Sequence, residues 1–169
     1  TTMAMDYLHQ LGHRHIGYVG ETECENRYNG YRTFLKERQL PFDSSYVASE
    51  PLTSNGGYDG AMKLLKQQPR LTAMFCGDDI AAIGVLRAIR DFGLKVPDDL
   101  SVIGIDDIET SQFLSPMLTT IHVPMEEMGQ LAAKMLIDRI DGGHTLPMKI
   151  NLPFYLAKRE SCAAPRSST

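Results

Sequence analysis

The sequence has few cysteines and lacks a long apolar run. Its 169 residues contain three cysteines, Cys24, Cys76 and Cys162, which are widely spaced and form no C-x-x-C pair. We therefore expect the reduced thiols of a cytoplasmic protein and no metal site, because no short-spaced ligand pair is present to begin one. The apolar runs are short and are interrupted by charges or glycines, so no membrane-spanning helix is predicted.

A basic face is also missing. The chain has 17 basic and 21 acidic residues, a formal net charge of −4, and its basic residues are scattered along the sequence. Modules that grip duplex DNA carry clustered lysines and arginines, so this chain alone is not predicted to bind nucleic acid. The first residues lack the basic start and apolar stretch of a signal peptide, and we expect the natural translation start to lie upstream of them.

The common motifs of nucleotide-binding enzymes and serine hydrolases are absent as well. The sequence contains no G-x-S-x-G, no G-x-x-x-x-G-K-[ST] and no G-x-G-x-x-G. Paired aspartates at strand ends can hold Mg²⁺ for phosphoryl transfer, but the lysine or hydroxyl residue that usually accompanies them has no convincing candidate here. We therefore expect no enzymatic activity and no cofactor, with a magnesium-dependent phosphoryl-transfer enzyme as an alternative.

What the sequence does have is a regular alternation of β-type and α-type patterns. Helical spacing of apolar residues predicts helices over 1–11, 26–39, 58–66, 80–92 and 125–140. Short apolar runs predict strands over 16–20, 46–48, 71–77, 100–105 and 118–123, with two more over 148–152 and 154–157. Residues 51–57 are predicted to form a loop. Strands and helices joined by a few residues are typical of right-handed βαβ units, so the predicted fold class is α/β with a parallel sheet.

Polar side chains follow three of the predicted strands. Residues 21–27, which include Arg27, follow the first strand, whereas Asp78-Asp79 and Asp106-Asp107 follow two later strands. Ligands of open α/β sheets bind at the carboxyl ends of the strands. Carboxylates accept paired hydrogen bonds from neighbouring hydroxyls, and an arginine donates two in fixed geometry, so this rim suits a polyol.

Each of these residues also has a structural interpretation. Asp79 is expected to be a helix cap or a first-turn acid, and Asp78 is either that cap or a ligand contact. Asp106 leaves its strand first and is expected to lie nearer the crevice than Asp107. Arg27 is either a solvated residue or a specific contact, and its place in a first helical turn favours the latter because cations are disfavoured there.

Seven segments, in order along nearly the whole chain, resemble the C-terminal part of LacI/GalR transcription regulators. They include Leu11–Gly20, which is similar to LGHR-x-IG-x-[VIL]-G, and Arg27–Tyr31, which is similar to R-x-x-G-[YFW]. Ala73–Ala81 and Val96–Asp107 match the A-[IVM]-x-x-x-[ND]-D-x-x-A and VP-x-D-[IL]-SV-[IV]-G-[FY]-DD patterns. The remaining three are Leu118–Ile121, Met128-Gly129 and Arg159–Ser161.

The resemblance implies a three-layer α/β sandwich of the periplasmic-binding-protein-like type, with an effector held between two subdomains. Residues 1–116 would form the C-terminal subdomain, 117–162 a crossover with a strand and helix of the N-terminal subdomain and late strands, and 163–169 a disordered tail. The helix-turn-helix that meets operator DNA would lie outside this chain. The implied protein is a cytoplasmic repressor, a homodimer whose contacts include the helix over 80–92, and its effector is a sugar or sugar derivative.

The effector contacts of the family map by motif onto Arg27, Asp78 and Asp106. Asp78 stands where the family often has asparagine, and Leu52 falls near a position where members often place an aromatic to stack on the ligand. Met125, near the crossing between subdomains, is a further candidate. A sugar-binding transport protein would share this fold and is the second alternative to the regulator. The sequence does not reveal the effector, the operator, or whether the effector induces or co-represses.

Overall fold

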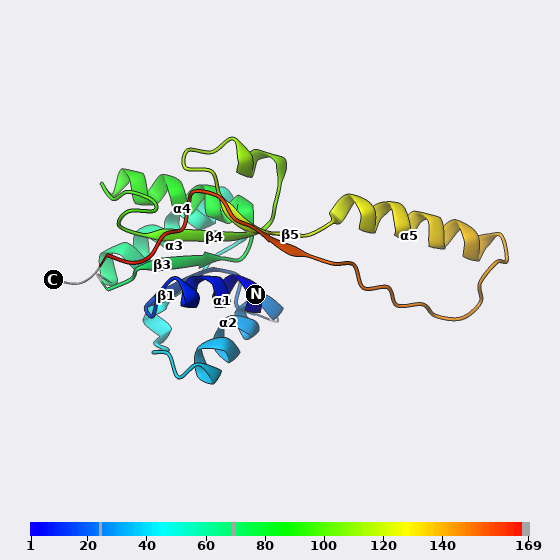
Figure 1. Ribbon diagram of the computed structural model, residues 1–169, viewed down its shortest axis with the longest axis horizontal. Coiled ribbons are helices and arrows are strands. Elements are labelled where there is room, and N and C mark those ends of the chain that lie inside the picture. The colour runs from blue at the N-terminus through cyan, green and yellow to red at the C-terminus, as the bar shows by residue number, and fades with distance from the viewer. Residues whose placement is uncertain (24, 69, 167–169) are drawn as a thin grey trace.

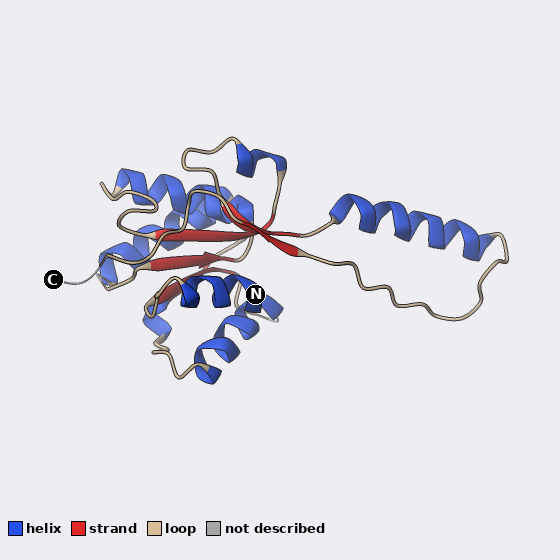
Figure 2. Ribbon diagram, viewed as in Figure 1, coloured by secondary structure: helices blue, strands red, loops and turns tan. Residues whose placement is uncertain are grey.

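The computed structural model describes residues 1–23, 25–68 and 70–166 and shows a sheet with helices on both of its faces (Figures 1 and 2). The helices are α1 (Thr2–Gln10), α2 (Asn26–Glu37), α3 (Ser54–Gln67), α4 (Asp79–Asp91) and α5 (Met125–Ile140), with short 3-10 helices η1 (Ser44–Tyr46) and η2 (Glu109–Gln112). The strands are β1 (Ile16–Gly20), β2 (Val47–Ser49), β3 (Ala73–Cys76), β4 (Ser101–Asp106), β5 (Thr119–His122) and β6 (Tyr155–Ala157).

The sheet has the strand order β2-β1-β3-β4-β5-β6. The first five of these strands are parallel, and β6 pairs with β5 in the antiparallel direction. Strands that follow one another in the chain from β1 to β4 are connected through α2, α3 and α4, as βαβ units require. The predicted α/β class with a parallel sheet is therefore confirmed, with one antiparallel strand at its edge.

Apolar side chains from both faces of the sheet form two separate cores. Successive residues of a strand point to opposite faces, so neighbours such as Val102 and Ile103 enter different cores. The core under α3 and α4 includes Val19, Leu64, Met74, Val85 and Val102. The core under α1 and α2 includes Met5, Leu8, Tyr18, Tyr31, Phe75 and Ile103. Burial on both sides explains why these strands are continuously apolar in the sequence.

A long extension leaves the body of the molecule after β5 and returns to it at β6. Figure 1 shows α5 and the following loop, residues 141–154, projecting away from the sheet. No residue of α5 is buried, and its side chains Leu136, Ile137 and Ile140 are 60%, 59% and 73% exposed. The described part of this chain thus leaves the apolar surface of the extension uncovered.

The lengths and hydropathies of the helices can be compared with those needed to span a membrane. Among residues 1–23, 25–68 and 70–166, none of them is both long enough and apolar enough for a bilayer crossing. Even α5, which has 16 residues, carries two acidic residues, Glu126 and Glu127, in its first turn.

The structure corrects two predictions of secondary structure. Residues 51–57 are not all loop, because α3 begins at Ser54 after Thr53, whose hydroxyl accepts a hydrogen bond from the Gly56 amide at 3.0 Å. Gly57, the last residue of the predicted loop, lies against the Ala81 backbone and allows α3 to pack closely on α4. The strand predicted over 148–152 is also wrong, since these residues lie in the extension without a neighbouring strand to pair with.

The first residues of the predicted disordered tail contact the body. The Ala163 carbonyl lies 2.8 Å from His13 Nε2 and accepts a hydrogen bond from the Ser101 hydroxyl at 3.1 Å. Arg166 donates to Asp99 at 2.6 Å. These contacts hold residues 163–166 against the sheet, and the rest of the predicted tail, 167–169, lies outside the described residues.

Two of the three cysteines can be placed. Cys76 and Cys162 carry free thiols, and Cys24 lies outside the described residues. Cys76 is completely buried in β3, and burial raises the pKa of its thiol well above the usual value. Burial also raises the pKa of the Cys162 thiol to about 12. Both thiols are therefore held protonated and unreactive at neutral pH.

Candidate functional site

The carboxyl ends of β1, β3 and β4 meet at one edge of the sheet, because these strands are parallel neighbours. The segments that follow them place Arg27, Asp78 and Asp106 at this edge. We call the residues at these three strand ends the rim. It is the place where ligands of parallel α/β sheets bind, and it brings together the side chains that the sequence singled out.

Arg27 lies in the first turn of α2, where it is flanked by two carboxylates. Its guanidinium Nη1 is 3.8 Å from Glu25 Oε2, and its Nη2 is 3.8 Å from Asp106 Oδ1. Glu25 is the N-cap of α2, and its other carboxylate oxygen accepts a hydrogen bond from the Arg27 amide at 2.9 Å. Arg27 is thus held at the rim by the way its helix begins, and its side chain is 31% exposed.

Asp106 ends β4 with its side chain turned toward Arg27. Its φ of 116° is a conformation that non-glycine residues rarely adopt, which indicates that the surroundings impose this turn of the chain. Burial raises the pKa of the Asp106 carboxyl to about 6, and Arg27 opposes this effect. Within the part of the chain that the structure describes, no hydrogen bond ends on this carboxylate. Its lone pairs are therefore available to hydroxyl or amino donors of a ligand.

Asp78 is the residue that caps α4. Its Oδ1 accepts a hydrogen bond from the Ala81 amide at 2.7 Å, which satisfies one of the free donors at the start of the helix. The sequence left open which aspartate of the pair caps this helix, and the structure assigns that role to Asp78. The second carboxylate oxygen of Asp78 has no partner in the hydrogen bonds given for the described residues, so capping does not prevent a ligand contact.

Asp79 has a structural role in the first turn of α4, as expected. It is fully buried and accepts hydrogen bonds from Ser111 Oγ at 2.7 Å and Thr120 Oγ1 at 2.6 Å. The Ile108 amide donates a third at 3.1 Å. Burial raises the pKa of Asp79, and these three donors oppose the rise. Asp79 therefore joins α4 to η2 and β5, beneath the rim.

The Asp107 carboxylate is also bonded to other side chains of the protein. Its carboxylate accepts a hydrogen bond from Arg159 and lies 2.9 Å from His122 Nδ1, and its side chain is only 8% exposed. The His122 ring stacks on Tyr155 with centroids 4.5 Å apart. Asp107 thus ties β4 to the strands through which the chain enters and leaves the extension, and Asp106 is the aspartate of the pair that faces Arg27.

The two remaining candidates lie at the margin of the rim. Leu52 packs over Gly77, where a β-carbon would be 2.7 Å from its Cδ2 atom, and so lies next to the strand end that carries Asp78. Met125 is the first residue of α5 and is 49% exposed. It lies two residues beyond Val123, whose amide donates to the Asp106 carbonyl at 3.4 Å. Met125 therefore lies where the extension departs, close in the chain to a segment bonded to the end of β4.

Sequence reasoning missed Glu25. The residue lies two positions before Arg27, at the start of a predicted helix, and an acidic residue there is a common helix-start signal. That position was visible in the sequence, but the charge of Glu25 acts on Arg27 only because the folded chain places the two side chains 3.8 Å apart. The structure also shows Glu21 nearby, with its carbonyl accepting a hydrogen bond from the buried Tyr18 hydroxyl at 2.9 Å.

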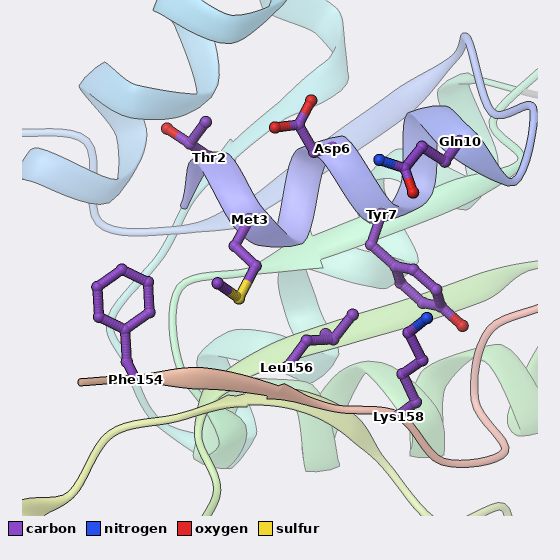
Figure 3. Close-up of a pocket in the computed structure, with 8 residues that line it drawn as sticks. All are labelled: Thr2, Met3, Asp6, Tyr7, Gln10, Phe154, Leu156 and Lys158. Carbon is purple, nitrogen blue, oxygen red and sulfur yellow. The ribbon is translucent and has the colours of Figure 1, made fainter.

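A second hollow lies between α1 and β6, away from the strand ends. Figure 3 shows it lined by Thr2, Met3, Asp6, Tyr7, Gln10, Phe154, Leu156 and Lys158. The Lys158 ammonium lies 5.0 Å from the centroid of the Tyr7 ring, and the Phe154 side chain is 56% exposed. The hollow is walled by a helix and an edge strand, and it lacks the convergent carboxylates and guanidinium of the rim.

Nor do the described residues group three or more histidine, cysteine or acidic side chains in an arrangement suited to a metal ion.

The amino-acid sequence of the chain is similar to a known domain family and to several curated proteins. Residues 5–162 match the periplasmic binding protein-like domain. The chain is 41% identical to the transcriptional repressor PurR of Photorhabdus laumondii over 82% of its own length and 42% of that protein. It is 37% identical to PurR of Yersinia pestis, over 95% of its own length and 48% of that protein. The chain therefore spans about half the length of these curated relatives.

Solved structures agree with the sequence relatives. A cellobiose complex of the regulator CelR superposes with a TM-score of 0.88 at 31% identity, covering 95% of this chain and 50% of that one. A LacI-family regulator from Enterococcus faecium with bound ribose gives 0.88 at 30% identity, covering 98% and 62%. A dimeric Lac repressor gives 0.87 at 30% identity, covering 97% and 61%.

Proposed function

This chain belongs to the periplasmic binding protein-like domain family of LacI/GalR-type regulators, and we propose that it senses a small-molecule effector within a transcriptional repressor. The observation that carries the proposal is the pairing of Arg27 with Asp106 at 3.8 Å on the rim, with the Asp106 carboxylate free to accept hydrogen bonds. The relatives named above are repressors, and this favours a sensing role over enzymatic catalysis.

The effector in this proposal is a sugar or a sugar derivative. A guanidinium and carboxylates on one rim can donate to and accept from vicinal hydroxyls at the same time. Two structural neighbours were solved with cellobiose or ribose bound, which supports the same class for this chain. Arg27, Asp78 and Asp106 are the proposed contacts, and Leu52 and Met125 are proposed to flank the ligand.

The second wall of the binding site is proposed to come from polypeptide outside this chain. We assign residues 1–116 to one subdomain and 117–162 to a crossover that contributes to a second. The exposed apolar side chains of α5 and of the loop 141–154 support this division, because large uncovered apolar surfaces mark contacts with another domain or chain. Operator DNA would be bound by a further domain of the repressor, and a cytoplasmic location is part of the same proposal.

A homodimer is the assembly that we propose. A structural neighbour is a dimeric Lac repressor, which supports a dimer for this chain. The outer side of α4 carries a groove lined by apolar and charged residues, among them Ile83, Leu86 and Arg87, together with Leu114 from the loop before β5. Phe113, 78% exposed, also lines it, and an aromatic side chain of that exposure is a suitable anchor for an interface.

The signal in this proposal is a shift between two arrangements of the subdomains. An effector that contacts both walls stabilises one arrangement, because it binds that arrangement more tightly than the other. The hinge would lie where β5 leads into α5 and β6 returns, and the hydrogen bonds of Asp107 fix the body side of that hinge. The dimer would then transmit the change in arrangement to the DNA-binding domains.

The test is a thermal-shift screen of the complete gene product against mono- and disaccharides, their phosphates and purines. A specific ligand at 100 times its Kd stabilises the folded state by about 2.7 kcal/mol, which a melting curve resolves. We expect at least one ligand whose stabilisation is lost in Arg27→Ala and retained in Arg38→Ala. Arg38 is the matched control, because it follows the same helix at its far end and pairs with Asp6 at 2.9 Å. A screen without any ligand that depends on Arg27 would refute the proposal.

A further inference from the structure

We propose that the effector of this chain carries no negative charge, and that Glu25 and Asp78 exclude sugar phosphates and other anions from the rim. The inference rests on the proposed function, because it concerns the ligand of the same site. It goes beyond that proposal by dividing the candidate effectors into anionic sugar derivatives and uncharged or amino-bearing polyols. Only the second class fits the rim. It also assigns a specificity role to Glu25, which lies beside the Arg27 guanidinium.

The first argument is that the guanidinium of the rim is already shared between two carboxylates. Arg27 lies 3.8 Å from Glu25 Oε2 and 3.8 Å from Asp106 Oδ1. A phosphate that approached Arg27 would have to displace these two carboxylates or remain beside them as a third anion. Like charges placed together in a partly buried site repel one another, so either outcome opposes anion binding.

The second argument concerns the helix N-termini, which usually supply the donors for an anion. Free backbone amides and the helix dipole attract phosphate groups at such positions. Here both helices that start at the rim are capped by carboxylates of the chain itself. The Arg27 amide of α2 donates to Glu25 at 2.9 Å, and the Ala81 amide of α4 donates to Asp78 at 2.7 Å. Each cap therefore occupies one amide donor and places a carboxylate of the chain where a ligand anion would otherwise lie.

The third argument is that carboxylate oxygens, which accept hydrogen bonds, outnumber the donors at and beside the rim. The Asp106 carboxyl already has a pKa raised to about 6, by burial first and then by the charges of Asp79 and Asp78. A further hollow at the ends of β1 and β2 is lined by Glu21, Glu23 and Glu50, together with Thr22, Ser49 and Pro51. A ligand hydroxyl or amine would donate hydrogen bonds to these oxygens and relieve their crowding, whereas a ligand anion would add to it.

The experiment is a calorimetric titration of the complete gene product with matched ligands. Each neutral sugar that binds is compared with its own 6-phosphate and with inorganic phosphate, at constant ionic strength. We expect the phosphate ester to bind at least ~10-fold more weakly than the parent sugar, a difference of ~1.4 kcal/mol. We call the ratio of these two affinities the gap. In Glu25→Gln the gap is expected to narrow, because Arg27 then loses one of its two carboxylate neighbours.

Two further variants keep the test decisive. Asp78→Asn removes a charge but keeps a good helix cap, so it is expected to fold and to narrow the gap even if Glu25→Gln is unstable. Glu37→Gln, at the far end of α2, is the control and is expected to leave the gap unchanged.

The possible outcomes separate this inference from the proposed function. A phosphate ester that binds as tightly as its parent sugar, with binding lost in Arg27→Ala, would overturn the inference and leave the proposed function standing. Saturable binding of inorganic phosphate that needs Arg27 would do the same. A gap that stays constant in both charge-removing variants would refute the roles of Glu25 and Asp78. Absence of binding for every ligand, charged or neutral, would overturn the proposed function and this inference with it.

Discussion

At the scale of single residues, the two aspartate pairs show how one sequence pattern serves different roles. In each pair one carboxylate is hydrogen-bonded within the fold. Asp79 accepts from three donors beneath the rim, and Asp107 accepts from Arg159. In each pair the other aspartate, Asp78 or Asp106, stands at the rim. The buried members fix the backbone from which the rim members project, so the rim depends on aspartates that do not reach it.

The first prediction concerns the cost of keeping Asp106 ionised in the apo protein. Its pKa is raised from 3.8 to about 6, so between these values the folded state binds a proton more strongly than the unfolded state does. The free energy of unfolding therefore falls as the pH rises from about 4 to about 6. Asp106→Asn is expected to raise it by about 1–2 kcal/mol above pH 6 and to change it little below pH 4.

Urea denaturation at a series of pH values measures this effect. Asp59→Asn is the control, because Asp59 is exposed on α3, and no pH-dependent gain is expected there. An Asp106→Asn protein that is less stable than the wild type at pH 7 would contradict the prediction. The same variant is expected to lose effector binding, so stability and function would change in opposite directions.

At the scale of elements, α3 and α4 approach each other unusually closely. A β-carbon on Gly84 would lie 1.9 Å from the Ser54 carbonyl oxygen, and one on Gly57 would lie 2.0 Å from the Ala81 carbonyl oxygen. These glycines therefore let the two helices pack backbone against backbone. The packing also brings the start of α3 alongside α4 and holds Leu52 over Gly77. The geometry of the rim thus depends on a contact between helices.

The second prediction is that Gly84→Ala destabilises the chain, although alanine is the better helix former. The helix propensity favours alanine by about 1 kcal/mol, but the backbone of α3 must move to admit a methyl group, and overpacking of this kind costs about 1–3 kcal/mol. We expect a lower free energy of unfolding in urea. Gly129→Ala in α5, where no atom lies within 4 Å of the added carbon, is expected to be neutral or slightly stabilising. Equal effects of the two substitutions would argue against the close contact.

At the scale of the whole molecule, the body and the extension differ in how they are stabilised. The body has two apolar cores, one on each face of the sheet. The extension has no buried residue in α5 and exposes apolar side chains along its length. Its helix lacks tertiary support within this chain, and most helices in proteins depend on such support. In the proposed repressor, the second subdomain would supply the cover that the extension lacks here.

The third prediction is that the body folds without the extension. Replacing Met125–Pro153 by a short turn would join β5 directly to its antiparallel neighbour β6, as in a hairpin. We expect the free energy of unfolding of the body to change by less than about 1 kcal/mol, because α5 buries nothing in it. Thermal unfolding followed by circular dichroism measures this, and size-exclusion chromatography is expected to show less self-association.

Arg159→Ala provides the contrast to this excision. Arg159 donates to the Leu118 carbonyl at 2.8 Å and to Asp107, so its loss leaves a buried carboxylate with one partner fewer. The substitution is expected to destabilise the body by about 2 kcal/mol or more. If removing the extension were as damaging as this single substitution, the independence of the body would be refuted.

The amino-acid sequence by itself determined the fold class, the order of most elements and the place of the rim. Apolar periodicity and helix-start signals are local properties, so they could be recognised without knowledge of distant contacts. The same holds for Arg27, Asp78 and Asp106, which follow apolar strands in the sequence and lie at one edge because parallel strands end together. Motif order along the chain was likewise enough to indicate the family, which the comparisons confirm.

Only the tertiary structure decided which aspartate of each pair stands at the rim, where α3 begins and that the extension has no buried residue in α5. Asp79 is occupied because Ser111 and Thr120, more than 30 residues away, supply its donors. The start of α3 tolerates Gly57 because α4 packs against it, which no local propensity reveals. Glu25 could enter the proposal on ligand charge only because the fold places its carboxylate 3.8 Å from Arg27. These features depend on contacts between distant segments, and such contacts exist only once the chain has folded.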